Sequence, residues 1–454
     1  MTIGPILVRT VRHFFPELNA WIDQIPDPRF PPLVIYHKRF LIWWGLSLFL
    51  CKLGSRRQLD YQLNTDGPEV LENLNRLAGT DQTTRPVNQT LEYYIEQIGE
   101  APVADLKTKM LRRMIRMKAL DGARLLGRSL ILIDGSGYLV FRKRHCDHCL
   151  TQRHGETTLY LHQVLEAKLL GPAGTVFSIA TEFIDNRDLS EVPAGSSPEQ
   201  VKQDCELKAL KRLVARLRSE FPQLRICFSG DGLYACGEGF RIAKEYKCDF
   251  IYTFKPGRLP ALWEEFQALL QLCPAQRVEW TTPPGAHQEY RWVNDLPYTD
   301  SAGRAWTFHA VVCHEIQPEG EESEWSWVTS LDVNHKTVVE VATKGGRARW
   351  REENQGFNTQ KNSGLNLEHA YSHTGYAAYY VLLQIGHLLL QLVEKGSLLR
   401  QLAQEQGKRT AVALYGSLKN MAHRLLESLR YRHWPDEAFD PAGAGSIQIR
   451  LDSS

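Results

Sequence analysis

The sequence carries almost no excess of either charge. Its 54 Lys and Arg residues are balanced by 52 Asp and Glu residues, which leaves a formal net charge of +2. A protein that coats nucleic acid through a global positive field is therefore excluded, and any DNA-binding surface must be a local concentration of basic residues. The composition, 43% apolar and 23% charged, is that of ordinary globular material, and 454 residues suffice for two or three domains.

The sequence also lacks the features of a secreted or membrane protein. Its N-terminus does not have the basic-then-apolar layout of a secretory signal. The apolar run at residues 40–51 spans 12 residues, whereas a membrane-crossing helix needs about 20, so we expect a buried helix there. The nine scattered cysteines are odd in number and indicate mostly free thiols in a reducing compartment. We therefore expect a soluble, cytoplasmic protein without a membrane partner.

Three acidic residues stand in informative local sequence. The apolar run at residues 129–133 leads into Asp134, a second run at residues 225–230 leads into Asp231, and Glu353 lies in a later, polar segment. Two strands that each end in a carboxylate, together with an acid on a later helix, can hold two divalent metals about 3.5–4 Å apart, which is the arrangement that cuts and joins phosphodiesters. The alternative is that both aspartates are only turn residues, because each is followed by glycine.

Three motifs in a fixed order support the first interpretation. They are Asp-Gly-Ser-Gly-Tyr from Asp134, Gly-Asp-Gly-Leu-Tyr-Ala around Asp231, and Glu-Asn-Gln-Gly-Phe-Asn-Thr-Gln-Lys-Asn from Glu353. The motifs and their spacing resemble the DDE transposases of bacterial insertion sequences, in particular the hairpin-forming, cut-and-paste superfamily with a β-rich insertion before the final Glu. The resemblance covers about residues 65–390. It implies an RNase H-like core, Mg²⁺ or Mn²⁺ bound by the three acids, and a homodimer acting on double-stranded DNA, both the terminal inverted repeats and the target.

The superfamily pattern around the final acid is Tyr, two residues, Arg, three residues, Glu, six residues, Lys. Arg349 and Glu353 match it, whereas Gly346 stands at the tyrosine position and Lys361 comes one residue late. Arg349, Glu353 and Lys361 are spaced by multiples of four, so on an α-helix they share roughly one stripe and would place two cations beside the carboxylate for phosphate binding. The alternative is a solvated ladder of ion pairs. Glu352 is a rival metal ligand, and we prefer Glu353 for its spacing from Arg349.

The most basic stretch lies between residues 106 and 128. Apolar residues interleave with its cations at helical spacing, so we expect an amphipathic helix. Such a face is usually only solvated, but this one has no acid between residues 107 and 120, which favours contact with DNA phosphates. The candidate contacts are Lys109, Arg112, Arg113 and Arg116.

A second cluster, His-Cys-Asp-His-Cys at residues 145–149, falls in the expected turn between the first two core strands. Cys146, Cys149, His154 and His162 offer zinc four N/S ligands, although their spacing matches no standard finger. The alternatives are two reduced thiols among loop histidines, or a redox Cys-x-x-Cys, which the surrounding pattern does not favour.

We expect an α/β fold, an RNase H-like mixed sheet flanked by helices, with an N-terminal helical domain and a β-rich insertion domain. The expected strands and the long helix between them are 130–134, 159–169, 175–184, helix 198–221, 224–228, 250–254, 277–280, 290–293, 306–312 and 325–329. The expected organisation is a helical DNA-binding region (1–125), a catalytic core (126–256 and 340–395), the insertion as a small domain or a flap (257–339), a helical region (396–435) and a loose tail (436–454). Within the last parts, residues 368–394 and 410–430 predict helices.

Tryptophans of the insertion, such as Trp292 and Trp306, could stack on bases but are more often core residues.

Three functions remain open from the sequence. The first is an active transposase, and the second is a transposase-derived DNA-binding protein without catalysis, whose expected mark is the loss of an acid. The third is a metal-dependent nuclease on the same fold without strand transfer. Inverted repeats flanking the reading frame would favour the first.

Overall fold

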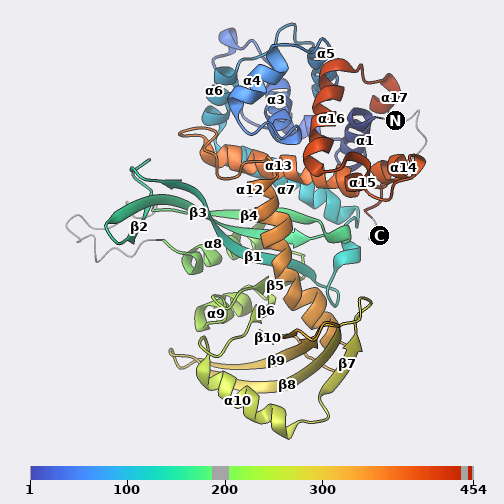
Figure 1. The fold of residues 1–454 in the computed structure, drawn as a ribbon. Helices are drawn as coiled ribbons and strands as arrows, with labels where there is room; N and C mark the ends of the chain where they lie inside the picture. Colours follow the sequence, from blue (N-terminus) through green and yellow to red (C-terminus); the bar gives the residue numbers. More distant parts are fainter. Residues whose placement is uncertain (1, 187–203, 441–447, 452–454) are drawn as a thin grey trace, which may run out of the picture. The chain divides into compact units, whose positions relative to one another are not determined.

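The structure is a computed structural model that describes residues 2–186, 204–440 and 448–451 (Figure 1). The chain folds into two compact units. A helical unit comprises Met1–Gly122, Gly171–Ile179 and Gln355–Ser454, and an α/β unit comprises Ala123–Leu170 and Ala180–Asn354. Each unit is thus assembled from segments that are distant in the sequence.

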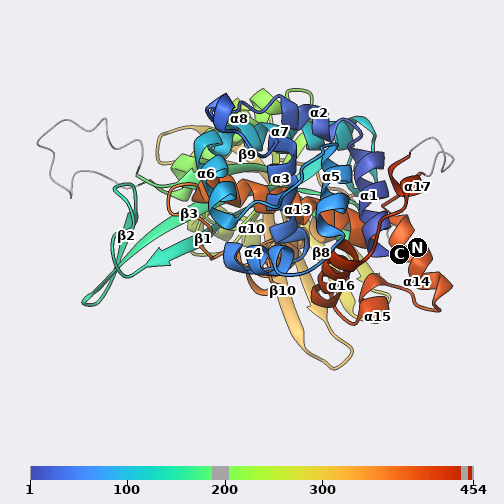
Figure 2. The ribbon, with the colours of Figure 1, turned by 90° about the horizontal axis from the view of Figure 1, so that it is seen from above.

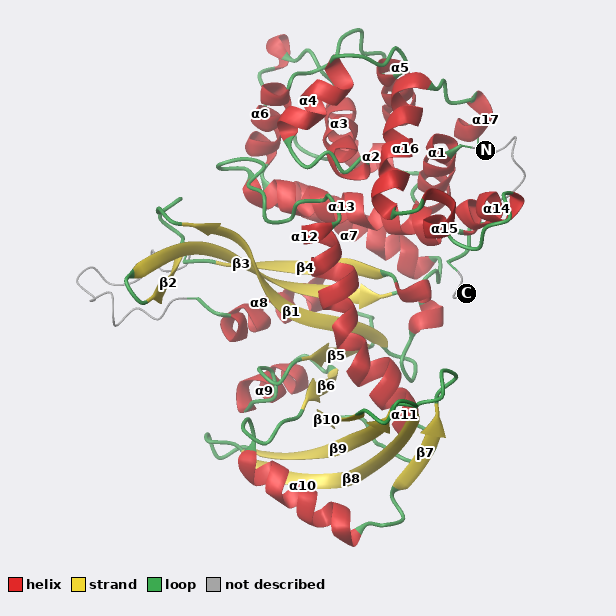
Figure 3. Ribbon diagram, viewed as in Figure 1, coloured by secondary structure: helices red, strands yellow, loops and turns green. Residues whose placement is uncertain are grey.

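The described part of the α/β unit is built on one mixed, ten-stranded sheet (Figure 3). The strand order is β2-β3-β1-β5-β6-β10-β9-β8-β7, and β4 also pairs with β3. The central strand β1 is antiparallel to β3 and parallel to β5, which is in turn parallel to β6. The strands are β1 Ser129–Phe141, β2 Leu150–His154, β3 Thr157–Leu170, β4 Val176–Ile184, β5 Ile226–Gly230, β6 Asp249–Thr253, β7 Arg277–Thr281, β8 His287–Thr299, β9 Ala305–Ile316 and β10 Glu322–Thr329.

Strand β1 is longer than its apolar run predicts. Residues 130–133 are buried, as expected, but the strand continues through Asp134 to Phe141 because β3 pairs with it along this length. Gly135 lies opposite Leu165 within the ladder, so Asp134 is neither at the end of a strand nor in a turn. A bulge between Gly137 and Leu139 follows.

The strands predicted for the insertion are confirmed, but they do not form a sheet of their own. β10 pairs with β6 in antiparallel fashion, so β7–β10 extend the central sheet. Both the small domain and the flap expected at residues 257–339 are therefore replaced by a continuation of one sheet.

Helices pack against this sheet. They are α8 Glu206–Glu220, α9 Gly237–Glu245, α10 Pro260–Leu272 and α11 Val338–Glu340, followed by η5 Val341–Gly346, η6 Arg347–Arg349 and η7 Glu352–Asn358. α8 contacts β3, α10 contacts β8, and η5 contacts β5 and β6. The helix predicted for residues 198–221 begins at Glu206, and its residues 198–203 lie outside the described part of the chain.

The helical unit is centred on α13 Tyr376–Lys395, which packs against α1, α3 and α7. α13 is the one described helix long and apolar enough to cross a membrane, and its apolar window is 94% buried, as in the core helix of a soluble protein. The run at residues 40–51 forms the buried helix α3, as predicted. The other helices are α1 Ile3–Phe14, α2 Leu18–Asp23, α3 Lys38–Leu50, α4 Arg56–Asn64, α5 Val70–Ala78, α6 Asn88–Ile98, α7 Glu100–Arg116, α12 Thr359–Asn362, α14 Ser397–Glu405, α15 Ala411–Tyr415, α16 Leu418–Tyr431 and α17 Asp436–Phe439.

Three C-terminal predictions need correction. Residues 368–375 precede α13 and are not helical. The helix expected at 410–430 is divided into α15 and α16 at Gly416, whose φ of 81° an α-helix does not accommodate. The expected loose tail contains α17, and Leu451 forms a β-bridge with Gly396.

Candidate functional site

The parallel pairing of β1 and β5 brings two of the predicted acids to the same level of the sheet. Leu132 pairs with Ser229, and Asp134 and Asp231 each follow two residues later. Side chains two residues apart in a strand point to the same face. Each aspartate lies two residues beyond one member of the pair Leu132 and Ser229, so the two carboxylates are at matching positions. Asp231 directly follows β5, where its Oδ1 accepts a hydrogen bond from the backbone N–H of Leu233 at 2.8 Å. Asp134 therefore lies within β1, and Asp231 lies just after the end of the adjacent strand β5.

Glu353 joins them from η7. Its Oε1 accepts a hydrogen bond from Arg349 Nη1 at 2.7 Å, and its side chain is 47% exposed. Burial raises the pKa of Asp134 to about 6; Arg349 opposes this rise, and the charges of Glu353, Glu206 and Asp231 add to it. Glu353 and Asp231 therefore both lie close enough to Asp134 for their charges to act on it.

A fourth acid at this site was missed by sequence reasoning. The carboxylate of Glu206, from the first turn of α8, lies so close to Gly135 that a Cβ there would overlap it. Its Oε2 accepts a hydrogen bond from the Tyr234 hydroxyl at 3.0 Å. Burial raises the pKa of Glu206, and the charge of Asp231 raises it further. Nothing in the local sequence distinguishes Glu206 from an ordinary acid at a helix start, because only the crossover from β4 to β5 brings it here.

Glu352, the rival of Glu353, points away from solvent. It is 0% exposed, and neither of its carboxylate oxygens has a hydrogen-bond partner within the described residues. Burial raises its pKa well above the usual range, opposed mainly by the charge of Lys168. Glu166, which pairs with Asp134 across β1 and β3, belongs to the same buried group and accepts hydrogen bonds from Thr181 Oγ1 at 3.2 and 3.0 Å. Glu352 is therefore an interior residue, which favours Glu353 as the accessible acid.

The donor set fits a hard divalent cation. Several carboxylates lie around Asp134, and their charges raise its pKa, whereas Arg349 is the cation that most opposes this rise. The negative charges around Asp134 therefore outnumber the positive ones, which favours the binding of a cation. Among the described residues, the oxygens of Asp134, Asp231 and Glu353 do not all lie within 4.8 Å of one another. In this arrangement the three acids therefore do not form the ligand group of a single ion.

The predicted stripe of Arg349, Glu353 and Lys361 is not formed. η7 is a π-helix, whose i→i+5 hydrogen bonds change the residues that share a face. Phe357, midway along the stripe, is buried. Lys361 lies in the helical unit, where its Nζ pairs with Glu368 at 2.9 Å. Only Arg349 is placed beside Glu353.

Gly346, which stands where the resembled superfamily has a tyrosine, is closely packed. Gly346 lies against the indole of Trp327 on β10, and a Cβ at this position would overlap the ring. A larger residue would displace η5 from the sheet.

The predicted basic segment forms α7, which ends at Arg116 rather than continuing toward β1. Lys109 pairs with Asp105 at 2.6 Å, and Arg113 pairs with Glu17 at 3.1 Å. Arg112 and Arg116 are exposed. An exposed basic triplet that the predictions did not include, Arg-Lys-Arg at residues 142–144, follows the end of β1.

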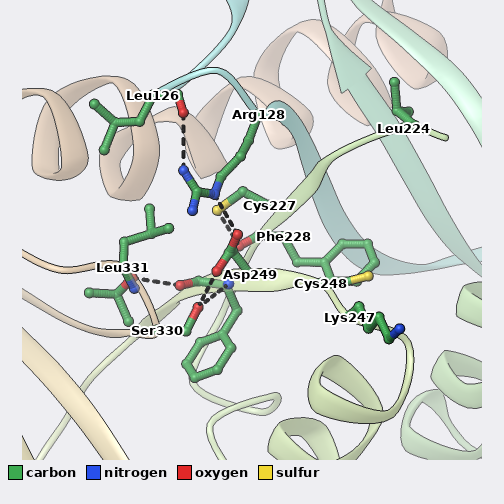
Figure 4. Close-up of polar contacts among 12 residues, drawn as sticks. Leu126, Arg128, Leu224, Cys227, Phe228, Lys247, Cys248, Asp249, Ser330 and Leu331 are labelled. Atoms are coloured by element: carbon green, nitrogen blue, oxygen red, sulfur yellow. Dashed lines mark hydrogen bonds and ion pairs between the residues drawn. The ribbon is translucent and has the colours of Figure 1, made fainter.

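The opposite ends of the core strands are held by an ion pair (Figure 4). Arg128, immediately before β1, pairs with Asp249, the first residue of β6, and donates to the carbonyl of Leu126 at 3.0 Å. Ser330 Oγ donates to Asp249 Oδ1 at 3.1 Å. These contacts help to fix the register of the strands that carry the acids.

The two tryptophans considered for base stacking differ. Trp292 is 2% exposed and packs edge-on against His335, so it is a core residue. Trp306 is partly exposed and lies beneath Lys244 Nζ, 5.2 Å from the ring centre, at a cavity of about 650 Å³.

Of the predicted zinc ligands, Cys146, Cys149 and His162 come together, whereas His154 does not join them.

Comparison of the chain with protein-family models and with curated proteins gives no match.

Proposed function

We propose that this chain is a DDE transposase that cleaves DNA at the ends of its element and transfers the free strand into target DNA. The observation that carries the proposal is the parallel register of β1 and β5, which brings Asp134 and Asp231 to matching positions. The charge of Glu353 also raises the pKa of Asp134. The resemblance of the three motifs to the DDE superfamily supports the same conclusion.

The strand order is compatible with an RNase H-like core. Apart from the short β2, the first three strands are neighbours in the sheet, and the fourth, β5, follows the helix α8 and joins β1 in parallel. In an RNase H-like sheet the acids of the first and fourth strands lie beside each other, which is the placement of Asp134 and Asp231.

The residues divide the chemistry among them. Asp134, Asp231 and Glu353 would bind two Mg²⁺ or Mn²⁺ ions, which when bound supply an activated water and stabilise the leaving 3′ oxygen. Glu206, held by Tyr234, adds negative charge beside the two aspartates. Arg349, which pairs with Glu353, would be available to bind a DNA phosphate in bidentate fashion if Glu353 served as a metal ligand.

The direct test uses a duplex that carries the sequence flanking the reading frame, labelled on either strand and incubated with purified full-length protein and Mg²⁺. We expect strand cleavage that leaves a 3′-hydroxyl, and joining of that end to a target plasmid. Asp134→Asn, Asp231→Asn and Glu353→Gln should each abolish both steps, whereas Glu324→Gln, on β10, should not.

Cleavage that survives all three substitutions would remove the site. Cleavage without joining would instead favour the nuclease, and specific binding without cleavage by the wild type would favour the DNA-binding protein. The partner in every case is double-stranded DNA, and a homodimer that bridges two ends is expected for the transposase.

A further inference from the structure

We propose that Cys146, Cys149 and His162 form a structural zinc site that fixes the hairpin of β2 and β3. This hairpin extends away from the body of the sheet in both views (Figure 1 and Figure 2). The proposal concerns how the α/β unit is held together and does not depend on the catalytic function.

The distances among the three side chains match a tetrahedral metal site. The two Sγ atoms lie 3.7 Å apart, and His162 Nε2 lies 3.4 Å from Cys146 Sγ and 3.5 Å from Cys149 Sγ. Zinc bonds of about 2.3 Å to sulfur and about 2.0–2.1 Å to nitrogen give tetrahedral edges of about 3.8 Å between sulfurs and about 3.5 Å between sulfur and nitrogen. A disulfide would need the sulfurs about 2.0 Å apart. The three atoms therefore stand where zinc would need them.

The strand register explains why these residues meet. Leu150 at the start of β2 pairs with Leu161 of β3, and one step further the same antiparallel register sets Cys149 opposite His162. The turn that precedes β2 brings Cys146 next to Cys149. There the backbone N–H of Cys146 donates a hydrogen bond to Cys149 Sγ at 3.4 Å.

His154 is excluded from the ligand set by the same register. It pairs with Thr157, five positions from His162 along β3, which is about 16 Å at the rise of a strand. His154 is also exposed. The predicted ligand set is therefore reduced to three side chains.

The fourth position is open to a water molecule, because no other Cys, His, Asp or Glu side chain of the described residues lies within 4.8 Å of all three ligand atoms. The buried residue Asp185 follows β4. The next residue, Asn186, donates through its backbone N–H to the carbonyl of His148 at 2.9 Å and through Nδ2 to that of Cys149 at 3.1 Å. A metal here would join the turn before β2 to the strand β3, and the contacts of Asn186 connect the same turn to the end of β4.

The test is metal analysis of the full-length protein purified under reducing conditions from zinc-supplemented cells. We expect about one zinc ion per chain, because the site has one set of ligands. Cys149→Ser and His162→Ala should lose it. His154→Ala and Cys205→Ser, which change an exposed histidine and an exposed cysteine outside the cluster, should retain it.

Two further measurements keep the proposal testable if the ligand variants fail to fold. Wild-type protein stripped of metal and titrated with Co²⁺ should develop the absorption of tetrahedral cobalt together with thiolate-to-cobalt charge transfer. His162→Cys should retain zinc through three thiolates.

The proposal is overturned if the wild type contains no zinc and gives no such cobalt spectrum. It is equally overturned if zinc persists in the Cys146→Ser/Cys149→Ser double variant, or if the two thiols prove to be joined as a disulfide in the protein purified without reductant.

Discussion

At the residue scale, the central feature is Asp134, an acid placed inside a strand among other acids. Its pKa of about 6 arises first from burial and then from the charges of Glu353, Glu206 and Asp231, with Arg349 opposing them. A carboxylate held in this way opposes folding once it is ionised, which is the usual cost of a site arranged to bind cations.

Asp134→Asn should therefore stabilise the protein while abolishing cleavage. Because the folded-state pKa lies above the ordinary value of 3.8, the contribution of Asp134 to stability is most favourable below about pH 4 and is lost as the pH rises through 6. We expect the variant to gain about 1–3 kcal/mol in the free energy of unfolding at pH 8 and almost nothing at pH 4. Urea titrations without divalent ions at the two pH values measure this. A loss of stability at pH 8 would contradict the assigned environment.

The two neighbouring glutamates should respond differently to the same change. Glu353→Gln removes an accessible acid that we propose as a metal ligand, so cleavage should fall by at least about 100-fold, the size of effect seen when one group that stabilises a transition-state charge is lost. Glu352→Gln replaces a buried group whose pKa is raised well above its usual range. It should change cleavage by only a few-fold. The cleavage rates of the two variants, measured with a labelled element end, show which glutamate matters for cleavage. A reversed order would make Glu352 the ligand.

At the scale of elements, the segment from α11 to α12 departs most from its sequence pattern. Four-residue spacing predicts an α-helical stripe, but η5 and η7 are π-helices and only Arg349 and Glu353 remain paired. π-Helical turns are rare and are frequent at functional sites. Their position depends on packing against the sheet, for instance of Gly346 on Trp327, and no local propensity reports such a contact.

Gly346→Tyr, which introduces the residue that the resembled superfamily has at this position, should disrupt this packing. The overlap of even a Cβ with Trp327 should cost at least about 1–3 kcal/mol, the usual range for overpacking. Thermal unfolding measures the loss, and Gly257→Ala is the control because a Cβ there meets nothing within 4 Å. If the tyrosine variant is as stable as this control, the close approach of η5 to β10 is wrong.

Helix α7 offers a test of the DNA surface. Arg112 and Arg116 are exposed, whereas Lys109 and Arg113 are only partly exposed. Arg112→Ala and Arg116→Ala should each weaken DNA binding and reduce the slope of log affinity against log salt by about one, and Lys109→Ala and Arg113→Ala should do less. Fluorescence anisotropy of a labelled duplex over a range of salt concentrations provides the slopes. Equal slopes for all four variants and the wild type would exclude α7 from the DNA contact.

At the scale of the whole molecule, the sequence predicts the elements better than their assembly. The strands β3 to β10 and the helix α3 follow local apolar patterns, so the sequence predicts them. The pairing of β10 with β6, which makes the insertion part of one sheet, is a contact between distant segments. So is the approach of Glu206 to Gly135, and for the same reason the pattern of residues around α8 gave no sign of it.

The sequence predicts the residues of the candidate site that lie in a recognisable motif, but not the others. Asp134, Asp231 and Glu353 each stand in a recognisable motif, and the structure brings them together. The three-residue metal cluster was predicted by its ligand types, but the exclusion of His154 needed the register of β2 and β3.

The central claim is that Asp134, Asp231 and Glu353 bind divalent cations jointly, and calorimetric titration of the zinc-loaded full-length protein with Mn²⁺, in the absence of DNA, tests it most directly. Binding should be present in the wild type and in Glu324→Gln, and each of Asp134→Asn, Asp231→Asn and Glu353→Gln should weaken it strongly. If all three variants bind Mn²⁺ as the wild type does, these carboxylates do not share a metal site.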